Sequence, residues 1–147
     1  MPTKKPSGTP SAASLTSKPP ETLNLFLDES LDSDTVANAL EGAGAKVERA
    51  TKHFPKGTAD EVWLEAAGKH KWIVLTRDKR IRYRQLERMA LQAASVRAFV
   101  FIGGNVTIND TAGILVTALP RILKISTNNP GPFIYHIGRA GKPVKMN

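Results

Sequence analysis

One stretch of the chain combines a carboxylate with a dense group of cations. Asp78 follows an apolar run, Trp72–Leu75, that ends at Thr76, and basic side chains surround it at Arg77, Lys79, Arg80, Arg82 and Arg84. Such a loop is either a solvated turn whose charges partly cancel, or a metal-binding acid beside a surface that holds a polyanion. The second interpretation requires other acids at matching strand ends.

The patterns around this loop predict alternating strands and helices. Short apolar runs predict strands near residues 23–27, 45–48, 72–76, 98–102 and 133–137, and helical spacing predicts helices over 34–44, from 58 onward, over 86–96 and from 109 onward. This alternation favours an α/β fold with a parallel sheet covered on both faces. Asp28 directly follows the first strand and Asp78 the third, so both are expected at the carboxyl edge, where such sheets bind ligands.

The position of Asp60 is open at this point. Thr58 and Glu61 match a capping box, which predicts that a helix begins here with Glu61 as the partner of Thr58. If that helix is a plain crossover, we expect its first turn at the opposite end of the sheet from Asp28 and Asp78. It reaches their edge only if the 49–57 loop first carries the chain back across.

Composition narrows the class of partner. The 147 residues suit one domain plus a tail, and a formal charge of +8 with a pI of about 10.0 favours nucleic acid or another anionic surface. The absence of cysteine excludes disulfides and thiolate metal sites. No run approaches the roughly 18 apolar residues of a membrane span, and the N-terminus lacks the apolar core of a secretory signal. We therefore expect a cytoplasmic protein.

Residues 1–21 differ in composition from the rest of the chain. This basic segment is rich in Pro and Ser and has almost nothing to bury. We predict a disordered tail, an inert extension rather than an additional RNA contact, followed by one folded domain over residues 22–147.

The order of these motifs resembles the PIN domain superfamily and, more narrowly, the short PIN-like, VapC-type toxins of toxin–antitoxin systems. The resemblance is carried by LFLDES and by TADEVWLEAAGKHKWIVLTRDKRIRYR: an acid after the first strand, an acid opening a helix, and T-x-D after a later strand. It spans about residues 23–138. It implies a PIN-like three-layer αβα sandwich with a central, mainly parallel sheet of about five strands.

The resemblance implies a metal-dependent endoribonuclease that hydrolyses RNA phosphodiesters. Asp28, Asp60 and Asp78 would be the catalytic, metal-binding acids, Thr76 a supporting hydroxyl, and the Asp60 helix would start near the acidic edge. Hard oxygen ligands favour Mg²⁺ or Mn²⁺, which could polarise a phosphoryl oxygen and position water for attack. The cations of the 77–84 loop would hold flanking phosphates. A cognate antitoxin protein is the implied partner, and the oligomeric state, a homo-oligomer included, stays open.

One departure from the longer PIN domains concerns the number of acids. Those domains carry a further acid on a helical insertion between the first strand and the Asp60 helix, and this chain lacks the insertion. Glu29 and Glu61 are the substitutes that the sequence offers, although the capping box already gives Glu61 a structural role. The number of bound metals is therefore open.

Two other functions fit parts of the pattern. A phosphoacceptor receiver-like signalling domain shares the doubly wound sheet, and Asp28–Glu29 and Lys142–Pro143 resemble its acidic and lysine–proline pairs, but Asp78 lies past the strand end where its phosphoacceptor belongs. A non-catalytic RNA-binding PIN-like module is the other, and the three suitable acids argue against it. A stable aspartyl-phosphate would identify the first, and RNA binding without metal-dependent cleavage the second.

Overall fold

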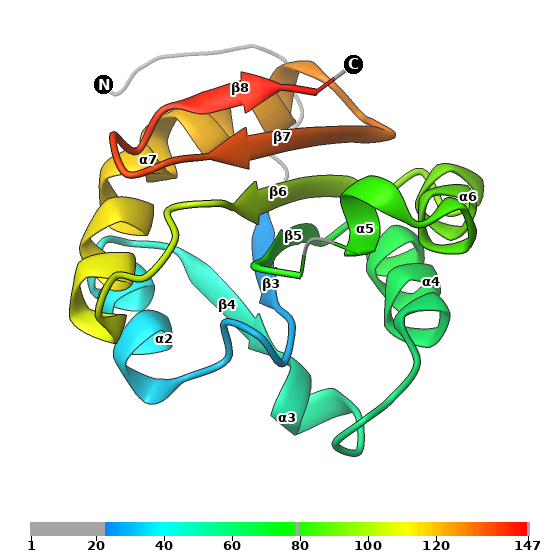
Figure 1. Cartoon of the computed structure of the whole chain (residues 1–147), viewed down its shortest axis with the longest axis horizontal. Helices are drawn as coiled ribbons and strands as arrows, with labels where there is room; N and C mark the ends of the chain where they lie inside the picture. The colour runs from blue at the N-terminus through cyan, green and yellow to red at the C-terminus, as the bar shows by residue number, and fades with distance from the viewer. Residues whose placement is uncertain (1–22, 79, 147) are drawn as a thin grey trace, which may run out of the picture.

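A six-stranded sheet organises residues 23–78 and 80–146, which are the residues that the computed structural model describes. Its strands are β3 (Asn24–Leu27), β4 (Lys46–Arg49), β5 (Ile73–Thr76), β6 (Arg97–Phe101), β7 (Phe133–Ile137) and β8 (Pro143–Lys145), in the order β4-β3-β5-β6-β7-β8 (Figure 1). All neighbours pair in parallel except β7 and β8. The prediction of a mainly parallel sheet of about five strands is confirmed. The sixth strand, β8, was not predicted because it is short and has no apolar run. The predicted tail over residues 1–21 lies outside the described residues.

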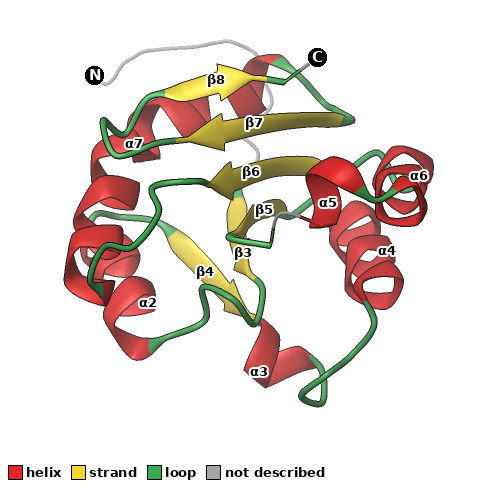
Figure 2. Cartoon of the chain, viewed as in Figure 1, coloured by secondary structure: helices red, strands yellow, loops and turns green. Residues whose placement is uncertain are grey.

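Helices cover both faces of this sheet (Figure 2). On one face α2 (Asp34–Gly42) and α7 (Ile108–Asn128) pack on Leu25 and Leu27, and on the other α4 (Asp60–His70), α5 (Arg80–Tyr83) and α6 (Gln85–Ala93) pack around Phe26. Alternate residues of β3 thus enter two separate cores, as expected for a strand buried on both sides. The single-turn α3 (Ala50–His53) follows β4. The three-layer αβα sandwich is confirmed.

Helix α6 turns a different face to the core from the one that its apolar residues suggest. Leu86 is 68% exposed and Met89 55% exposed, whereas Glu87 and Leu91 are buried. Glu87 and Leu91 are four residues apart and so share one face of the helix, and burying that face leaves Leu86 and Met89 on its flanks. The helix over residues 86–96 was predicted correctly, but the spacing that predicts it puts Leu86 and Met89 on its apolar face, and that face is not the buried one.

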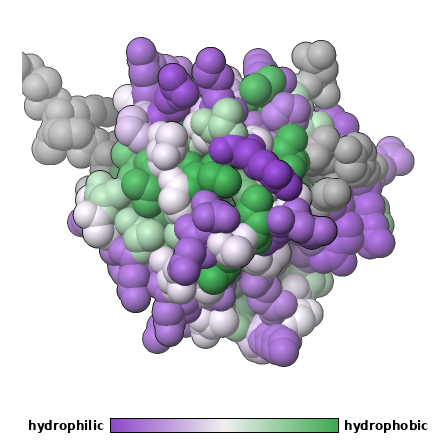
Figure 3. All heavy atoms as spheres, turned by 60° about the vertical axis from the view of Figure 1, so that its left-hand side comes forward, coloured by the Kyte–Doolittle hydropathy of each residue, from purple (hydrophilic) through white to green (hydrophobic). Residues whose placement is uncertain are grey.

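The surface carries scattered apolar side chains. On the side that Figure 3 brings forward, hydrophobic residues lie among a mostly hydrophilic surround, which is ordinary for a folded protein surface.

Among the described helices, none combines the length and the apolar character that crossing a membrane requires, including the 21-residue α7.

Candidate functional site: an acidic cleft at the carboxyl edge of the sheet

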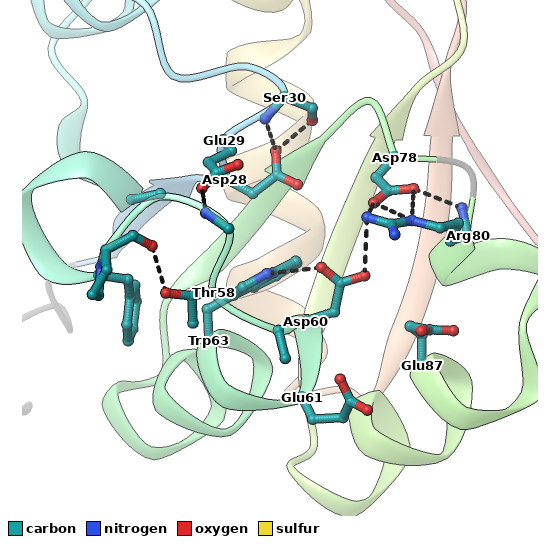
Figure 4. Close-up of a pocket in the computed structure, with 15 residues that line it drawn as sticks. Asp28, Glu29, Ser30, Thr58, Asp60, Glu61, Trp63, Asp78, Arg80 and Glu87 are labelled. Atoms are coloured by element: carbon teal, nitrogen blue, oxygen red, sulfur yellow. Dashed lines mark hydrogen bonds and ion pairs between the residues drawn. The ribbon is translucent and has the colours of Figure 1, made fainter.

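An acidic cleft of about 520 Å³ opens where β3 and β5 end and α4 begins (Figure 4). Arg80 is the basic residue among its described lining, and the acidic residues that line it are Asp28, Glu29, Asp60, Glu61, Asp78 and Glu87. The chain has 13 acidic residues and a formal charge of +8. Nearly half of the acids of a cationic protein therefore gather in one cleft.

Asp28 lies at the deep end of the cleft, where β3 ends. Its side chain is almost fully buried, and it accepts hydrogen bonds from the Ser30 hydroxyl at 2.5 Å, the Ser30 backbone N–H at 3.1 Å and the Thr76 hydroxyl at 2.6 Å. Burial raises the pKa of Asp28 to about 6, although the hydrogen bonds from Ser30 and Thr76 oppose this rise. Among the described residues, Asp28 has no cationic partner.

The buried hydroxyl of Thr76 connects Asp28 to Asp78. It donates to Oδ2 of Asp28 and accepts the backbone N–H of Asp78 at 2.9 Å. Ser30 completes the connection, because its Oγ accepts the backbone N–H of Arg77 at 2.8 Å and lies 3.2 Å from Oγ1 of Thr76. Sequence reasoning included Thr76 but missed Ser30, whose place two residues after Asp28 was the available signal.

Asp60 lies at the same edge of the sheet as Asp28 and Asp78. The expectation that a plain crossover places the first turn of its helix at the opposite end is wrong. Strand β4 runs parallel to β3, so the chain leaves β4 at the carboxyl edge, and a crossover helix must start there before it returns to the beginning of β5. Asp60 therefore opens α4 at the acidic edge, as the resemblance implied.

The predicted capping box before α4 is also wrong. Ala59 is the N-cap residue and makes no side-chain cap bond, while the Thr58 hydroxyl donates to the carbonyl oxygen of Pro55 at 2.5 Å. Asp60 is held by the buried Trp63, whose Nε1–H donates to Oδ1 at 3.1 Å. Burial raises the pKa of Asp60, and the positive charge of Arg80 and the bond from Trp63 oppose this effect.

Asp78 already has a cation. The Arg80 guanidinium bonds both of its carboxylate oxygens, with Nε at 2.9 Å from Oδ1 and 2.8 Å from Oδ2, and Nη2 also contacts Oδ2. The same Nη2 lies 3.6 Å from Oδ2 of Asp60. Burial acts to raise the pKa of Asp78, but the hydrogen bonds and charge of Arg80 outweigh it and leave this pKa below its ordinary value. The bonds to Asp78 and the charge of Asp60 raise the pKa of Arg80.

The chain matches a known protein family. A model of the PIN like domain family matches residues 23–103, which is more than half of the chain and includes all three aspartates. The chain belongs to the PIN-like domain family. PIN domains are generally nucleases and typically use divalent metals. No curated protein and no solved structure matches the chain at a significant level.

The two substitute acids suggested by the sequence line the cleft of this PIN-like domain at its rim. Glu29 is exposed, and its Oε2 accepts the backbone N–H of Gly57 at 2.5 Å, which ties the loop after β3 to the loop before α4. Glu61 is exposed on the first turn of α4. Their role as metal ligands stays a prediction.

The basic loop of the PIN-like domain does not act as a single surface. Arg77 lies over the Phe101 ring at 5.4 Å from its centre and donates to the carbonyl oxygen of Gly104, and Arg80 is engaged by the cleft acids. Arg84 is exposed beside α6. Lys79 and the side chain of Arg82 lie outside the described residues. Phosphate binding by this loop stays a prediction, and Arg80 has a second role that the sequence did not indicate.

Sequence reasoning missed Glu87, an acid in the wall of the cleft. It is 7% exposed, and its Oε2 has no hydrogen-bond partner among the described residues. In Figure 4 it lies beneath Arg80 and beside Asp60. The available signal was its place four residues before Leu91, in a helix that must bury one face.

The fit of a divalent cation can be judged from these donors. Among the described residues, no group of three or more acidic or histidine side chains is placed to hold a metal ion. Arg80 lies against Asp60 and Asp78. The donor set nevertheless suits a hard cation, since all its ligands are carboxylate oxygens and Asp28 has no described cation beside it. That Asp28, Asp60 and Asp78 hold a divalent metal stays a prediction, and it requires Arg80 to leave Asp60 and Asp78.

Proposed function

We propose that this PIN-like domain is a metal-dependent endoribonuclease that hydrolyses RNA phosphodiesters. The observation that carries the proposal is the gathering of six acids in one cleft of a chain with a formal charge of +8. Carboxylates that repel one another in a cleft lower the stability of the folded state unless a cation neutralises them. A cationic protein around an anionic cleft also suits a substrate that is a polyanion held over a metal.

Asp28, Asp60 and Asp78 would hold the cation, with Mg²⁺ or Mn²⁺ favoured by their oxygen donors. When bound, the ion supplies polarisation of a phosphoryl oxygen and activation of water for in-line attack. The chain itself supplies orientation: Thr76 and Ser30 fix the carboxylate of Asp28, and Trp63 fixes that of Asp60. Arg84 would bind a flanking phosphate from outside the cleft.

The resemblance to VapC-type proteins supports a toxin in a type II toxin–antitoxin system. An antitoxin could inhibit the enzyme by placing an Arg or Lys side chain against the cleft acids, where a guanidinium already fits beside Asp78. Acidic antitoxin residues could cover Arg84 and its neighbours by charge complementarity.

One observation favours a second candidate, a non-catalytic RNA-binding PIN-like module. Arg80 pairs with Asp78 and Asp60, and a permanent pairing of this kind would exclude a metal and leave only a binding surface. The two candidates differ in one result, which is whether a divalent cation turns RNA binding into RNA cleavage.

The test is incubation of the protein with total RNA and with a tRNA pool, with Mn²⁺, with Mg²⁺ or with chelator. We expect cleavage only with metal. Asp28→Asn, Asp60→Asn and Asp78→Asn should each reduce it at least about 100-fold, because a catalytic metal stabilises the transition state by several kcal/mol. Glu65→Gln, an exposed acid on the same helix as Asp60, is the matched control. RNA binding that never leads to cleavage would establish the second candidate.

The toxin assignment has its own experiment. Expression of residues 22–147 in bacterial cells should slow growth, the Asp78→Asn variant should not, and the neighbouring small gene product should restore growth on co-expression. If a chain that cleaves RNA in vitro is harmless at high expression without any partner, the nuclease stands and the toxin role is wrong.

A further inference from the structure

Glu87 is a buried carboxylate with one oxygen that has no hydrogen-bond partner among the described residues. Its side chain is more than nine-tenths buried, it faces the cleft, and its Oε2 accepts no hydrogen bond from any described residue. Burying a polar oxygen without a partner destabilises the folded state, and more so when the group is charged. A group kept in this condition indicates a partner that arrives in another state of the site.

Arg80 lines the same cleft as Glu87 and is a cation that could become this partner. Its charge and that of Glu87 already act on each other, and the two residues belong to consecutive helices, α5 and α6. About half of the Arg80 side chain is exposed, at 51%. Its contact with Asp60 is long at 3.6 Å, whereas its bonds to Asp78 are 2.8–2.9 Å. Arg80 is therefore held firmly by Asp78 and only loosely by Asp60.

Arg80 and a divalent cation compete for the same oxygens. Both Asp78 oxygens are bonded by the guanidinium, so a metal that uses Asp78 must displace Arg80. An arginine stays charged under all physiological conditions, and a guanidinium displaced into the neighbourhood of a bound divalent cation would be repelled by it. The displaced side chain needs a new anionic partner close by.

We propose that Arg80 is an internal cation that exchanges with the metal, and that Glu87 is the carboxylate that receives Arg80 when the metal enters. The inference rests on the proposed metal site. In the metal-free cleft Arg80 pairs with Asp78 and lies against Asp60, while Oε2 of Glu87 has no described partner. In the metal-bound cleft the ion takes over Asp60 and Asp78, and Arg80 pairs with Glu87, so metal entry supplies the partner that Glu87 lacks. Glu87 is thus a positioning residue that acts through Arg80.

The test is a double-mutant cycle on the Mn²⁺ affinity of the full chain, measured by calorimetry or by the EPR signal of free Mn²⁺. Arg80→Gln should raise the affinity about tenfold, because the competitor is gone, and Glu87→Gln should lower it about tenfold, because Arg80 then stays on Asp60 and Asp78. In the Arg80→Gln background, Glu87→Gln should change the affinity by less than about twofold. Arg84→Gln and Glu65→Gln are the matched charge controls.

Each outcome decides the proposal. An equal loss of affinity on Glu87→Gln with and without Arg80 would make Glu87 a direct metal ligand and overturn the exchange, and so would an unchanged or lower affinity in Arg80→Gln. Circular dichroism checks folding. If Glu87→Gln does not fold, Glu87→Asp, which withdraws the carboxylate by one methylene, replaces it with the same expected direction. A wild-type chain that binds no Mn²⁺ would instead remove the metal from the proposed function.

Discussion

The two walls of the cleft hold their aspartates in opposite ways. Asp28, on the β3 wall, is buried and is held by hydroxyls and a backbone N–H, and burial raises its pKa to about 6. Asp78, on the β5 wall, is held by the guanidinium of Arg80, which leaves its pKa low. Hydroxyls orient a carboxylate without neutralising it, whereas a guanidinium does both. The β3 wall therefore still needs a cation, and the β5 wall already has one.

The largest expected effect of this contrast is on the pH dependence of stability without metal. A rise in the pKa of Asp28 from 3.8 to about 6 corresponds to roughly 3 kcal/mol. Because the folded state binds this proton more tightly, its contribution is fully present below pH 3.8 and is lost as the pH rises through about 6. The free energy of unfolding of wild type minus that of Asp28→Asn, measured in chelator by urea titration, should fall across this window. A flat difference would mean that Asp28 is not the buried, unneutralised acid described above.

For Asp78, on the β5 wall, we expect a smaller change of stability with pH, and its sign is opposite to that of Asp28. The lowered pKa of Asp78 means that its contribution is present above the unfolded pKa and is lost on acidification. At pH 7 without metal, Asp78→Asn should therefore lower the free energy of unfolding, by about 0.5–1 kcal/mol because Arg80 is half exposed to solvent.

The matched comparison for this variant is Arg80→Gln, which should cost a similar amount. The double variant should lower the free energy of unfolding no more than either single variant does, because the two single variants and the double variant all remove the same ion pair. Additive losses would show that Arg80 stabilises the fold through some other contact.

The smallest effect concerns RNA binding outside the cleft. Arg84→Ala should reduce the slope of log affinity against log salt by about 1, because one fewer phosphate contact releases one fewer counterion. Lys69→Ala, an exposed cation in the last turn of α4 and so far from Asp60, should leave the slope unchanged. Filter binding with an RNA pool in the absence of metal measures these slopes. Equal slopes in wild type, Arg84→Ala and Lys69→Ala would mean that RNA binds to another surface.

The sequence predicted which residues meet at the carboxyl edge better than it predicted how they are paired. Asp28 and Thr76 directly follow or end apolar strand runs, so a parallel sheet must bring them to one edge. The partner of Arg80 could not be predicted, because a cationic loop beside an acid looks the same whether its arginines contact phosphate or fold back on the acid. Glu87 was missed because Leu86 and Met89 were assigned to the buried stripe of α6, and only packing against α4 decides which flank is buried.

Thermal unfolding of wild type and Asp28→Asn, first in chelator and then in Mn²⁺, tests the central claim that Asp28 is a metal-holding acid without a cation. In chelator the variant should melt at the higher temperature, because it no longer buries an unneutralised charge. In Mn²⁺ at about 1,000 times the dissociation constant, wild type should gain about 4.1 kcal/mol, which exceeds the roughly 3 kcal/mol cost of the buried charge. The variant should gain almost nothing, so the order of the two melting temperatures reverses. If Mn²⁺ stabilises both proteins equally, or neither, the cleft is not the metal site.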